Sequence, residues 1–429
     1  MKHAIVGEKG AMRQSRVLII GGGAAGLTAA IAAARRGASV TLLEGGARVG
    51  QKILASGNGR CNLTNLSASP EAYNHPDFVS PVLDAYTCER VCAFFGEMGL
   101  LTRADDEGRV YPATNAAGSV LDVLRMECAH LGVDVRCGFE VVRVVEVPGD
   151  GGFEVASEGG ETLRAEAVVV TTGGGCELLG NLGHELIECV PVLGPIQTDA
   201  APIRGLSGVR VRCAATLLGG VADGGAGGED AGGNAIATER GELLFRDYGV
   251  SGIMIFDLSR YLEAGCVISI DFFPDISRPE LEAMIAQRCE ALAWRTAETF
   301  FAGMLHDRVA RAVLRAAGVS GDTPVADVPQ ARLVALLKDF RLRVLGLADA
   351  GQAQVTRGGA SVAEFDLDTM ASRRVEGLFA AGEVLDIDGR SGGFNLHWAW
   401  ASGIVAGESA ARAAMTRAAE SDGSSRGSA

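Results

Sequence analysis

Two stretches of the chain, far apart in sequence, combine glycine-rich turns with a carboxylate. The first holds the pattern Gly21-x-Gly23-x-x-Gly26, and the second, residues 377–403, holds Gly382-Glu383. Glycines let a backbone approach a phosphate, a helix N-terminus stabilises negative charge, and a carboxylate accepts hydrogen bonds from sugar hydroxyls. Local structure cannot bring together two turns so far apart in the sequence. We therefore predict that both turns bind the same long anionic cofactor.

The first turn lies within a predicted strand–helix–strand unit, residues 16–44. The helix begins with Ala24 and Ala25, and the second strand ends at Glu44 and Gly45. In this context the pattern is typical of dinucleotide binding, because its three glycines allow a tight turn, the approach of a pyrophosphate and close helix packing. Glu44 would bind ribose hydroxyls and repel a 2′-phosphate, which favours FAD or NAD over NADP. An ordinary strand–helix turn is the alternative.

The polar stretch GQKILASGNGRCNLTN, residues 50–65, predicts a long loop around the same cofactor. Lys52 and Arg60 supply positive charge, and the GNG triplet starting at Gly57 allows positive φ values and free backbone N–H groups. The loop also contains Ser56, Cys61 and Asn62. A plain surface loop is the alternative. Cys61 could be a redox or nucleophilic thiol, but no resolving cysteine lies nearby, which favours a packing or polar-contact role.

Two further segments complete the predicted site. Thr172, Gly173 and Gly174 end a buried strand with small residues, where a cofactor could pass. Glu383 would accept hydrogen bonds from ribityl hydroxyls. After Gly393 a helix begins, and its first amides would face the pyrimidine edge of a flavin, where negative charge develops on reduction; these residues are Phe394, Asn395 and Leu396. We expect Trp398 and Trp400 to pack this helix rather than to stack on a flavin.

Length, composition and charge limit the possible classes of protein. The chain has 429 residues, 48% of them hydrophobic and 21% charged, which predicts a globular protein of two or three domains. A net charge of −14 disfavours nucleic acid as a partner and leaves a small-molecule substrate. We find no membrane span, signal peptide, metal-ligand pattern or indication of oligomeric state. The ten cysteines lack framework spacing, so reduced thiols and a cytoplasmic location are the expectation.

The fold class we predict is α/β, with a Rossmann-like FAD-binding domain of the two-dinucleotide-binding flavoprotein type. That domain is discontinuous and takes residues 16–190 and 350–429. A small β domain, 191–270, and a small helical domain, 271–349, are inserted between its parts. We expect a flexible leader at 1–15 and a disordered tail at 420–429.

Taken together, these motifs resemble the BaiN-like, aminoacetone-oxidase-like bacterial flavoproteins. The resemblance rests on GGGAAGLTAA at 21–30, the loop 50–65, VYPATNAAGSVLDVL at 110–124, TTGG at 171–174, GELLFRDYGVSG at 241–252 and the segment 369–403. It implies an FAD domain with β and helical inserts. It also implies FAD binding at the residues above and at the strand around Val141.

The chain departs from this family at three places. The segment between Gly174 and Gly183-His184 is contracted to GCELLGNL, and the glycine ending after Arg357 differs slightly. His397 stands where Gln is typical. A histidine there could donate a proton or sense the charge of the flavin, or it could simply replace the hydrogen bonds of Gln.

The resemblance implies a flavin oxidoreductase that moves hydride through flavin N5. We favour NAD(P)H-dependent reduction of a conjugated C=C bond in a steroid- or bile-acid-like substrate, with NAD(P)H binding only transiently, because no second dinucleotide motif follows a strand. Tyr248 and Tyr111 are candidate acids, and His397 and Arg246 are weaker candidates. The alternatives are an O2-dependent oxidase of a small amine such as aminoacetone, and a flavin-dependent tRNA-modifying transferase, which the acidic charge disfavours.

Overall fold

The computed structural model describes residues 17–147, 152–220, 233–349, 351 and 353–426. The chain divides into two compact units, and the second is inserted into the first. Unit 1 contains residues 1–190 and 356–429, and unit 2 contains residues 191–355. The expected leader, 1–15, lies outside the described residues.

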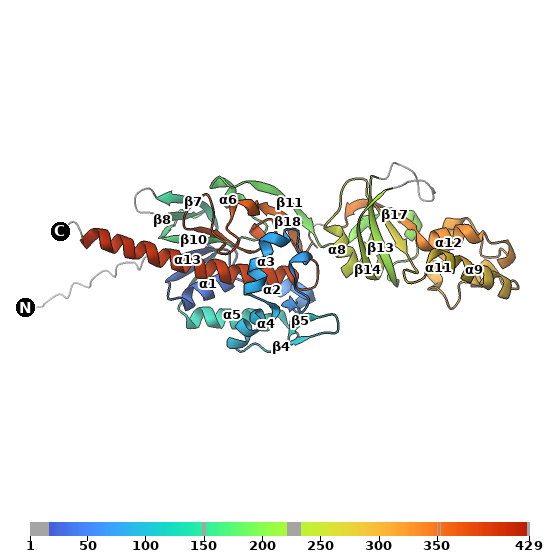
Figure 1. The fold of residues 1–429 in the computed structure, drawn as a ribbon, viewed down its shortest axis with the longest axis horizontal. Coiled ribbons are helices and arrows are strands. Elements are labelled where there is room, and N and C mark those ends of the chain that lie inside the picture. The colour runs from blue at the N-terminus through green and yellow to red at the C-terminus, as the bar shows by residue number, and fades with distance from the viewer. Residues whose placement is uncertain (1–16, 148–151, 221–232, 350, 352, 427–429) are drawn as a thin grey trace, which may run out of the picture. The chain divides into compact units, whose positions relative to one another are not determined.

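Unit 1 is built on a five-stranded parallel sheet with the strand order β19-β10-β1-β2-β6 (Figure 1). Its strands are β1 (Val17–Ile20), β2 (Val40–Glu44), β6 (Asp134–Cys137), β10 (Ala167–Val170) and β19 (Leu378–Ala380). All four residues of β1 and of β10 are buried, as their unbroken apolar sequences predict for inner strands of a parallel sheet. The order brings the carboxyl ends of β1, β2, β10 and β19 to one edge of the sheet.

Helices and smaller sheets surround this central sheet. The helices of unit 1 are α1 (Ala24–Arg35), α2 (Gln51–Ala55), α3 (Pro76–Ala85), α4 (Cys88–Glu97), α5 (Ala117–His130), α6 (Glu177–Asn181) and α13 (Phe394–Arg426). One antiparallel sheet has the order β3-β5-β4, with β3 (Thr64–Asn65), β4 (Thr102–Ala104) and β5 (Arg109–Pro112), and a second joins β7 (Val141–Val147), β8 (Gly152–Ser157) and β9 (Thr162–Ala165). The last pairing, between β11 (Leu186–Val192) and β18 (Val355–Ala360), lies where the chain leaves and re-enters the unit.

Several local expectations differ from the structure. The loop 50–65 contains the short helix α2 and a 3-10 turn at Ser56–Gly59. The disordered tail expected at 420–429 is wrong for residues 420–426, since the backbone of α13 is helical as far as Arg426, and residues 427–429 lie outside the described residues.

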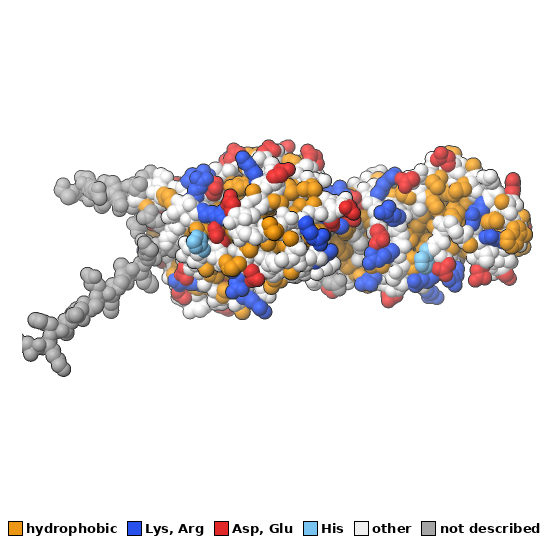
Figure 2. Space-filling view, turned by 90° about the horizontal axis from the view of Figure 1, so that it is seen from below, with side chains coloured by type: hydrophobic (Ala, Val, Ile, Leu, Met, Phe, Trp, Pro, Cys, Tyr) orange, Lys and Arg blue, Asp and Glu red, His pale blue; other side chains and the backbone are white. Residues whose placement is uncertain are grey.

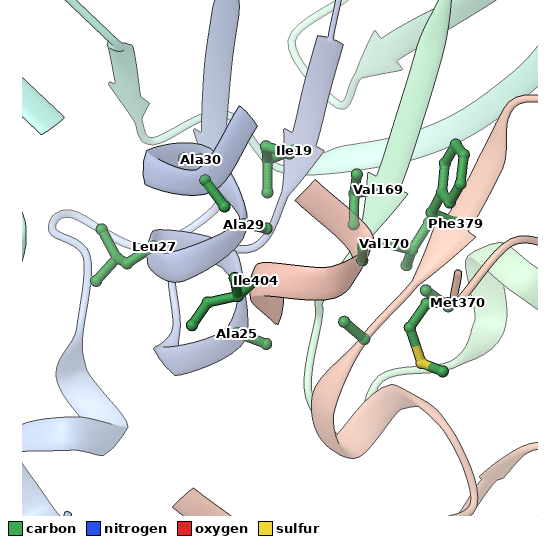
Figure 3. Close-up of a cluster of buried hydrophobic side chains, with 14 of the residues drawn as sticks. Ile19, Ala25, Leu27, Ala29, Ala30, Val169, Val170, Met370, Phe379 and Ile404 are labelled. Atoms are coloured by element: carbon green, nitrogen blue, oxygen red, sulfur yellow. The ribbon is translucent and has the colours of Figure 1, made fainter. Parts of the chain in front are cut away.

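Helices α1 and α13 cross in close contact, because small residues line both of them. A Cβ atom on Gly403 would lie 2.4 Å from the carbonyl oxygen of Ala25, and one on Gly407 would lie 2.2 Å from that of Ala29. Thr28 Oγ1 also donates a hydrogen bond to the carbonyl oxygen of Trp400. Figure 3 shows Ala25 and Ala29 of α1 close to Ile404 of α13, beside the buried side chains of β1 and β10. The first and last helices of the unit therefore share one core.

This contact makes the substitution Gly407→Ala costly. We expect it to lower the free energy of unfolding by about 2–3 kcal/mol, because the added methyl group overlaps the backbone of α1. Gly96→Ala is the matched control: Gly96 also lies inside a helix, but its added Cβ would meet no atom within 4 Å. The control should be neutral or stabilising by up to about 1 kcal/mol. Equal melting temperatures for the two variants in thermal unfolding would contradict the close packing.

Unit 2 contains a closed barrel with the strand order β12-β15-β14-β13-β16-β17. The barrel strands are β12 (Ile196–Thr198), β13 (Arg210–Gly219), β14 (Asn234–Arg246), β15 (Gly249–Ser251), β16 (Val267–Asp271) and β17 (Phe340–Leu347). Its helices are α7 (Ala200–Ile203), α8 (Ile253–Ser259), α9 (Arg278–Ala291), α10 (Ala297–Phe300), α11 (Asp307–Ala317) and α12 (Gln330–Lys338). The segment 271–349, expected to be helical, thus also contains the last barrel strand. Its helices α9 to α12 are themselves an insertion between β16 and β17, whose pairing Ile270↔Phe340 closes the barrel across them.

No helix among the described residues is long and apolar enough to span a membrane.

Candidate cofactor site

The glycine turn after β1 leaves open space at the start of α1. Gly21 and Gly26 both lie against other backbone. A Cβ on Gly21 would lie 2.5 Å from the carbonyl oxygen of Thr171, and a Cβ on Gly26 would lie 1.8 Å from the carbonyl oxygen of Gly21. A Cβ on Gly23 would meet no atom within 4 Å. Gly23 is also the N-cap residue of α1 and makes no side-chain capping bond. The first N–H groups of α1, which no intrahelical carbonyl can accept, therefore face a space that could hold a pyrophosphate.

Glu44 lies at the end of β2, next to this turn. One carboxylate oxygen accepts the N–H of Gly22 at 2.7 Å, and the other accepts the N–H of Gly46 at 2.7 Å. These two bonds fix the carboxylate at the sheet edge and leave each oxygen a further lone pair. The position and chemistry of Glu44 suit ribose hydroxyls. Gly45 follows it, and a Cβ there would overlap the carboxylate of Glu140, so a larger residue would displace that exposed side chain.

A cation of α2 and a carboxylate that follows β19 lie together next to the end of β10. Lys52 Nζ of α2 lies 3.0 Å from Glu383 Oε2, and the second oxygen of Glu383 accepts the N–H of Thr356 at 2.6 Å. Gly173 lies beside this pair, because a Cβ there would be 3.4 Å from Lys52 Nζ and 3.5 Å from Glu383 Oε2. Thr172, Gly173 and Gly174 therefore border the same space as Lys52 and Glu383.

The N-terminus of α13 forms another wall of this region. Gly393 has a φ of 106°, and a Cβ there would lie 2.5 Å from the carbonyl oxygen of Thr64 and 2.9 Å from Asn62 Oδ1. Asn62 Oδ1 is buried and has no hydrogen-bond partner within the described structure. Asn395 uses its own side chain locally, since it bonds both the N–H and the carbonyl of Gly389. The backbone amides of Phe394, Asn395 and Leu396 lie in the first turn, where helix amides lack intrahelical acceptors.

His397 is fully buried and both of its ring nitrogens are used. Nδ1 lies 2.6 Å from Thr64 Oγ1, and Nε2 lies 2.9 Å from the carbonyl oxygen of Tyr86. A carbonyl can only accept, so Nε2 carries the proton and Nδ1 accepts from the hydroxyl of Thr64. Burial lowers the pKa of His397 to about 4, which keeps the ring neutral at physiological pH. This geometry agrees with the interpretation of His397 as a hydrogen-bonding replacement for Gln and offers no proton at neutral pH.

Three further side chains near the site, those of Cys61, Trp398 and Trp400, make mainly packing contacts. Cys61 is completely buried and burial raises its pKa to about 12, so its thiol is not a nucleophile at neutral pH. Trp398 and Trp400 are buried and donate hydrogen bonds to the carbonyls of Gly382 and Leu63, as expected for helix packing. Arg60 instead lies over the ring of Tyr111, with 5.0 Å from its guanidinium carbon to the ring centroid.

The other residues predicted from the sequence lie in the loop 50–65, at the start of β7 and in unit 2. Ser56 Oγ donates to the carbonyl of Ile53 and so stabilises the end of α2, while Gly57 begins the expected run of positive φ values. Val141 is buried at the start of β7. Tyr248 and Arg246 belong to unit 2, where Arg246 ends β14 and Tyr248 follows it. Their catalytic roles stay predictions.

Two contacts in the site are hard to predict from the sequence. The hydroxyl of Thr171 donates to the carbonyls of Ile20 and Gly21, which ties β10 to the glycine turn. Thr356 holds Glu383 through its backbone N–H, which any residue except proline could supply. A hydroxyl at the end of a buried strand could have indicated the first contact. The second arises only when the chain returns from unit 2.

His184 is the buried centre of a structural network in unit 1. Its Nδ1 lies 2.9 Å from Glu364 Oε2, its Nε2 lies 3.0 Å from Ser372 Oγ, and its ring stacks on Phe365. Ser372 Oγ also accepts the N–H groups of Arg374 and Val375, so its lone pairs are occupied. The network fixes the turn after α6 to the segment 364–375, so His184 has a structural role.

These residues fit FAD. The open cradle at Gly23 suits a pyrophosphate, Glu44 suits a ribose, and the carboxylate of Glu383 with the buried, unpaired Asn62 Oδ1 suits hydroxyl and N–H donors of a ribityl chain and a flavin ring. Apart from Val141, the cofactor-binding residues predicted from the sequence lie in the four segments at this edge of the sheet or in the loop next to it.

The Lys52–Glu383 pair gives a prediction for the site. Glu383→Gln should weaken FAD binding about tenfold, because a neutral amide replaces a charged acceptor, whereas the Thr356 N–H can still bond to the amide oxygen. Lys52→Met should leave stability within about 0.5 kcal/mol of the wild type, because the lysine side chain is 71% exposed. Titration of the apoprotein with FAD by fluorescence quenching, together with thermal unfolding, measures both. Unchanged FAD affinity in Glu383→Gln would contradict the assignment.

Comparison with known proteins places the chain among FAD-dependent oxidoreductases. A model of the HI0933-like protein Rossmann domain matches residues 15–409. The 3-dehydro-bile acid delta(4,6)-reductase of Clostridium scindens is 31% identical over 421 residues, which cover 92% of this chain and 99% of that protein. The ribosomal RNA dihydrouridine synthases of Escherichia coli and Haemophilus influenzae are each 28% identical over 410 and 418 residues, covering 91% and 93% of this chain and 96% and 99% of those proteins. These similarities confirm the resemblance that the motifs indicated.

Proposed function

The chain belongs to the HI0933-like Rossmann-domain family and is an FAD-dependent oxidoreductase, and on this premise we propose that it reduces a C=C bond conjugated to a carbonyl group in a small hydrophobic substrate. NAD(P)H is the proposed source of electrons. The observation that carries the proposal is the set of FAD-compatible groups at one sheet edge, in a chain 31% identical to a reductase of 3-dehydro-bile acids.

When bound, FAD supplies a ring that carries hydride from a nicotinamide to an electrophilic carbon. The protein must then protonate the neighbouring carbon and stabilise the carbonyl oxygen as it becomes negative. Tyr111 suits this task because it belongs to unit 1, on the strand β5 that pairs with β3. The guanidinium of Arg60 lies over its ring and adds positive charge next to this tyrosine. Tyr248 of unit 2 is the second candidate.

The two tyrosines can be separated by substitution. If Tyr111 is the acid, Tyr111→Phe should lower the rate of substrate reduction about 100-fold while reduction of the flavin by NAD(P)H stays within about twofold. Tyr248→Phe should then have a small effect on both rates. Stopped-flow measurement of the two half-reactions tells the residues apart, and the opposite pattern would assign the proton to Tyr248.

One anaerobic experiment tests the reaction class. The purified, FAD-loaded protein is mixed with NADH, NADPH or aminoacetone, and the flavin absorbance is followed. Bleaching by a nicotinamide, then reoxidation by a 3-oxo-4-ene steroid, supports the reductase. Bleaching by the amine alone would establish the oxidase instead. Protein prepared from the Gly23→Ala variant serves as a control for reactions of free flavin.

A uracil ring in RNA is a second candidate substrate, because two relatives are named ribosomal RNA dihydrouridine synthases. Dihydrouridine forms when the uracil C5=C6 bond, which is conjugated to the C4 carbonyl, is reduced, so the same hydride and proton transfers would serve. The net charge of −14 opposes RNA binding. Figure 2 shows Lys and Arg side chains mixed with Asp and Glu on the face it draws, and exposed pairs such as Arg210–Glu242 and Arg240–Asp275 neutralise part of that basic charge. Reoxidation of the reduced flavin by uridine-containing rRNA but not by the steroid would favour this candidate.

A further inference from the structure

Two thiols lie close together beside the cofactor site, in unit 1. Sγ of Cys176 and Sγ of Cys189 are 3.5 Å apart. Cys176 is buried at the start of α6, directly after the turn 171–175, and Cys189 is exposed on β11. Sulfur atoms at this separation need only side-chain rotation and a small shift of the strand to reach the S–S bond length of about 2.05 Å. Neither thiol has a role in the reaction proposed above.

We propose that Cys176 and Cys189 are a modification site at which a low-molecular-weight disulfide converts the two thiols to a reversible intramolecular disulfide. Cys189, the exposed thiol, attacks one sulfur of the small disulfide as a thiolate, forms a mixed disulfide and releases one small thiol. Cys176 then attacks the sulfur of Cys189, and the second small thiol leaves. The two cysteines are oxidised, the small disulfide is reduced to two thiols, and these thiols carry both protons.

The surroundings of the pair determine how it reacts. Although the Cys189 residue is exposed, partial desolvation of its thiol, followed by the hydrogen bond with Cys176, raises the pKa of Cys189 to about 12, so this thiol reacts slowly at neutral pH. Cys92 is the competing thiol, because a hydrogen bond from Cys88 lowers its pKa to about 7. Cys88 and Cys92 are one turn apart on α4, where a disulfide would distort the helix. Cys176 and Cys189 lie on separate elements and have no such constraint.

The new bond would fasten the segments that border the ribityl part of the site. The turn before Cys176 contains Gly173, which lies beside Lys52 and Glu383. The strand that pairs with β11 is β18, and its Thr356 N–H holds the carboxylate of Glu383. Because a bound cofactor leaves through local opening of such segments, we expect the disulfide to slow the release of FAD by about tenfold.

The bond itself is tested by peptide mapping. The FAD-loaded protein is treated with glutathione disulfide, alkylated and digested without reductant. We expect a cross-linked peptide pair containing Cys176 and Cys189, and an intact mass lower by two hydrogen atoms. Cys189→Ser should give no cross-link, and Cys176→Ser should retain a glutathione adduct on Cys189. Cys92→Ser and Cys137→Ser are controls that should still form the bond. A stable glutathione adduct on Cys189 in the wild type would overturn the proposal.

The effect on the cofactor has its own measurement. Release of FAD is followed by the rise of flavin fluorescence after dilution, for the oxidised and the reduced protein and for Cys189→Ser treated in the same way. Slower release only in the oxidised wild type supports the role of the bond, and equal rates overturn it. The cross-link can be scored without any cofactor or substrate, so its failure is distinguishable from a failure of the proposed reductase.

Discussion

Gly23→Ala should remove FAD binding and leave the fold intact. The backbone of Gly23 has φ −82° and ψ −161°, which alanine adopts without strain, and the added Cβ would meet no protein atom within 4 Å. That open position is where the pyrophosphate has to approach the start of α1, so a methyl group there should weaken FAD binding by about 100-fold or more. The measurement is FAD titration of the apoprotein, with circular dichroism and thermal unfolding to establish that the variant is folded.

Two other glycines give this experiment its controls. Gly118→Ala also adds a methyl group in the first turn of a helix, α5, where its Cβ would meet no atom within 4 Å, and it should bind FAD as the wild type does. Gly26→Ala should fail to fold or melt far earlier, because its Cβ would lie 1.8 Å from the carbonyl oxygen of Gly21. If a folded Gly23→Ala protein binds FAD with wild-type affinity, the pyrophosphate does not bind at this turn.

The sequence predicted those parts of the site that depend on local backbone rules. The strand–glycine–helix pattern at 21–26 and the end of β2 at Glu44 are short-range features, and the structure has them at the expected residues. The contact of Lys52 with Glu383 is different, because 331 residues separate the two side chains and only the order of strands in the sheet brings them together. Both residues were expected to bind the same cofactor, but no pattern in the sequence predicted their contact with each other.

The inserted unit was harder to predict because its barrel closes late. The strand β17 follows four helices and pairs with β16 across them. Its sequence, FRLRVLGL, begins with the apolar–polar alternation of a strand, but its place after the helices put it inside the predicted helical domain, 271–349.

The buried histidine at position 397 should make the protein sensitive to mild acid. Its pKa is about 4 in the folded state, below the ordinary value of 6.5, so between these pH values the unfolded chain binds a proton that the native protein does not. The contribution of a neutral His397 to stability is therefore fully present above pH 6.5 and is lost as the pH falls toward 4. At pH 5 the loss should be about 2 kcal/mol.

His397→Gln isolates this effect. The amide oxygen of Gln can accept the Thr64 hydroxyl and its NH2 group can donate to the Tyr86 carbonyl, so both hydrogen bonds of the histidine have a replacement. We expect the variant to be about as stable as the wild type at pH 7 and about 2 kcal/mol more stable at pH 5, as measured by denaturant unfolding at both pH values. Burial also lowers the pKa of His184, and that contribution cancels in the comparison because both proteins keep the residue. Parallel stability curves for the two proteins between pH 7 and 5 would show that the native pKa of His397 is not lowered, and a proton-donating role near neutral pH would then be possible for it.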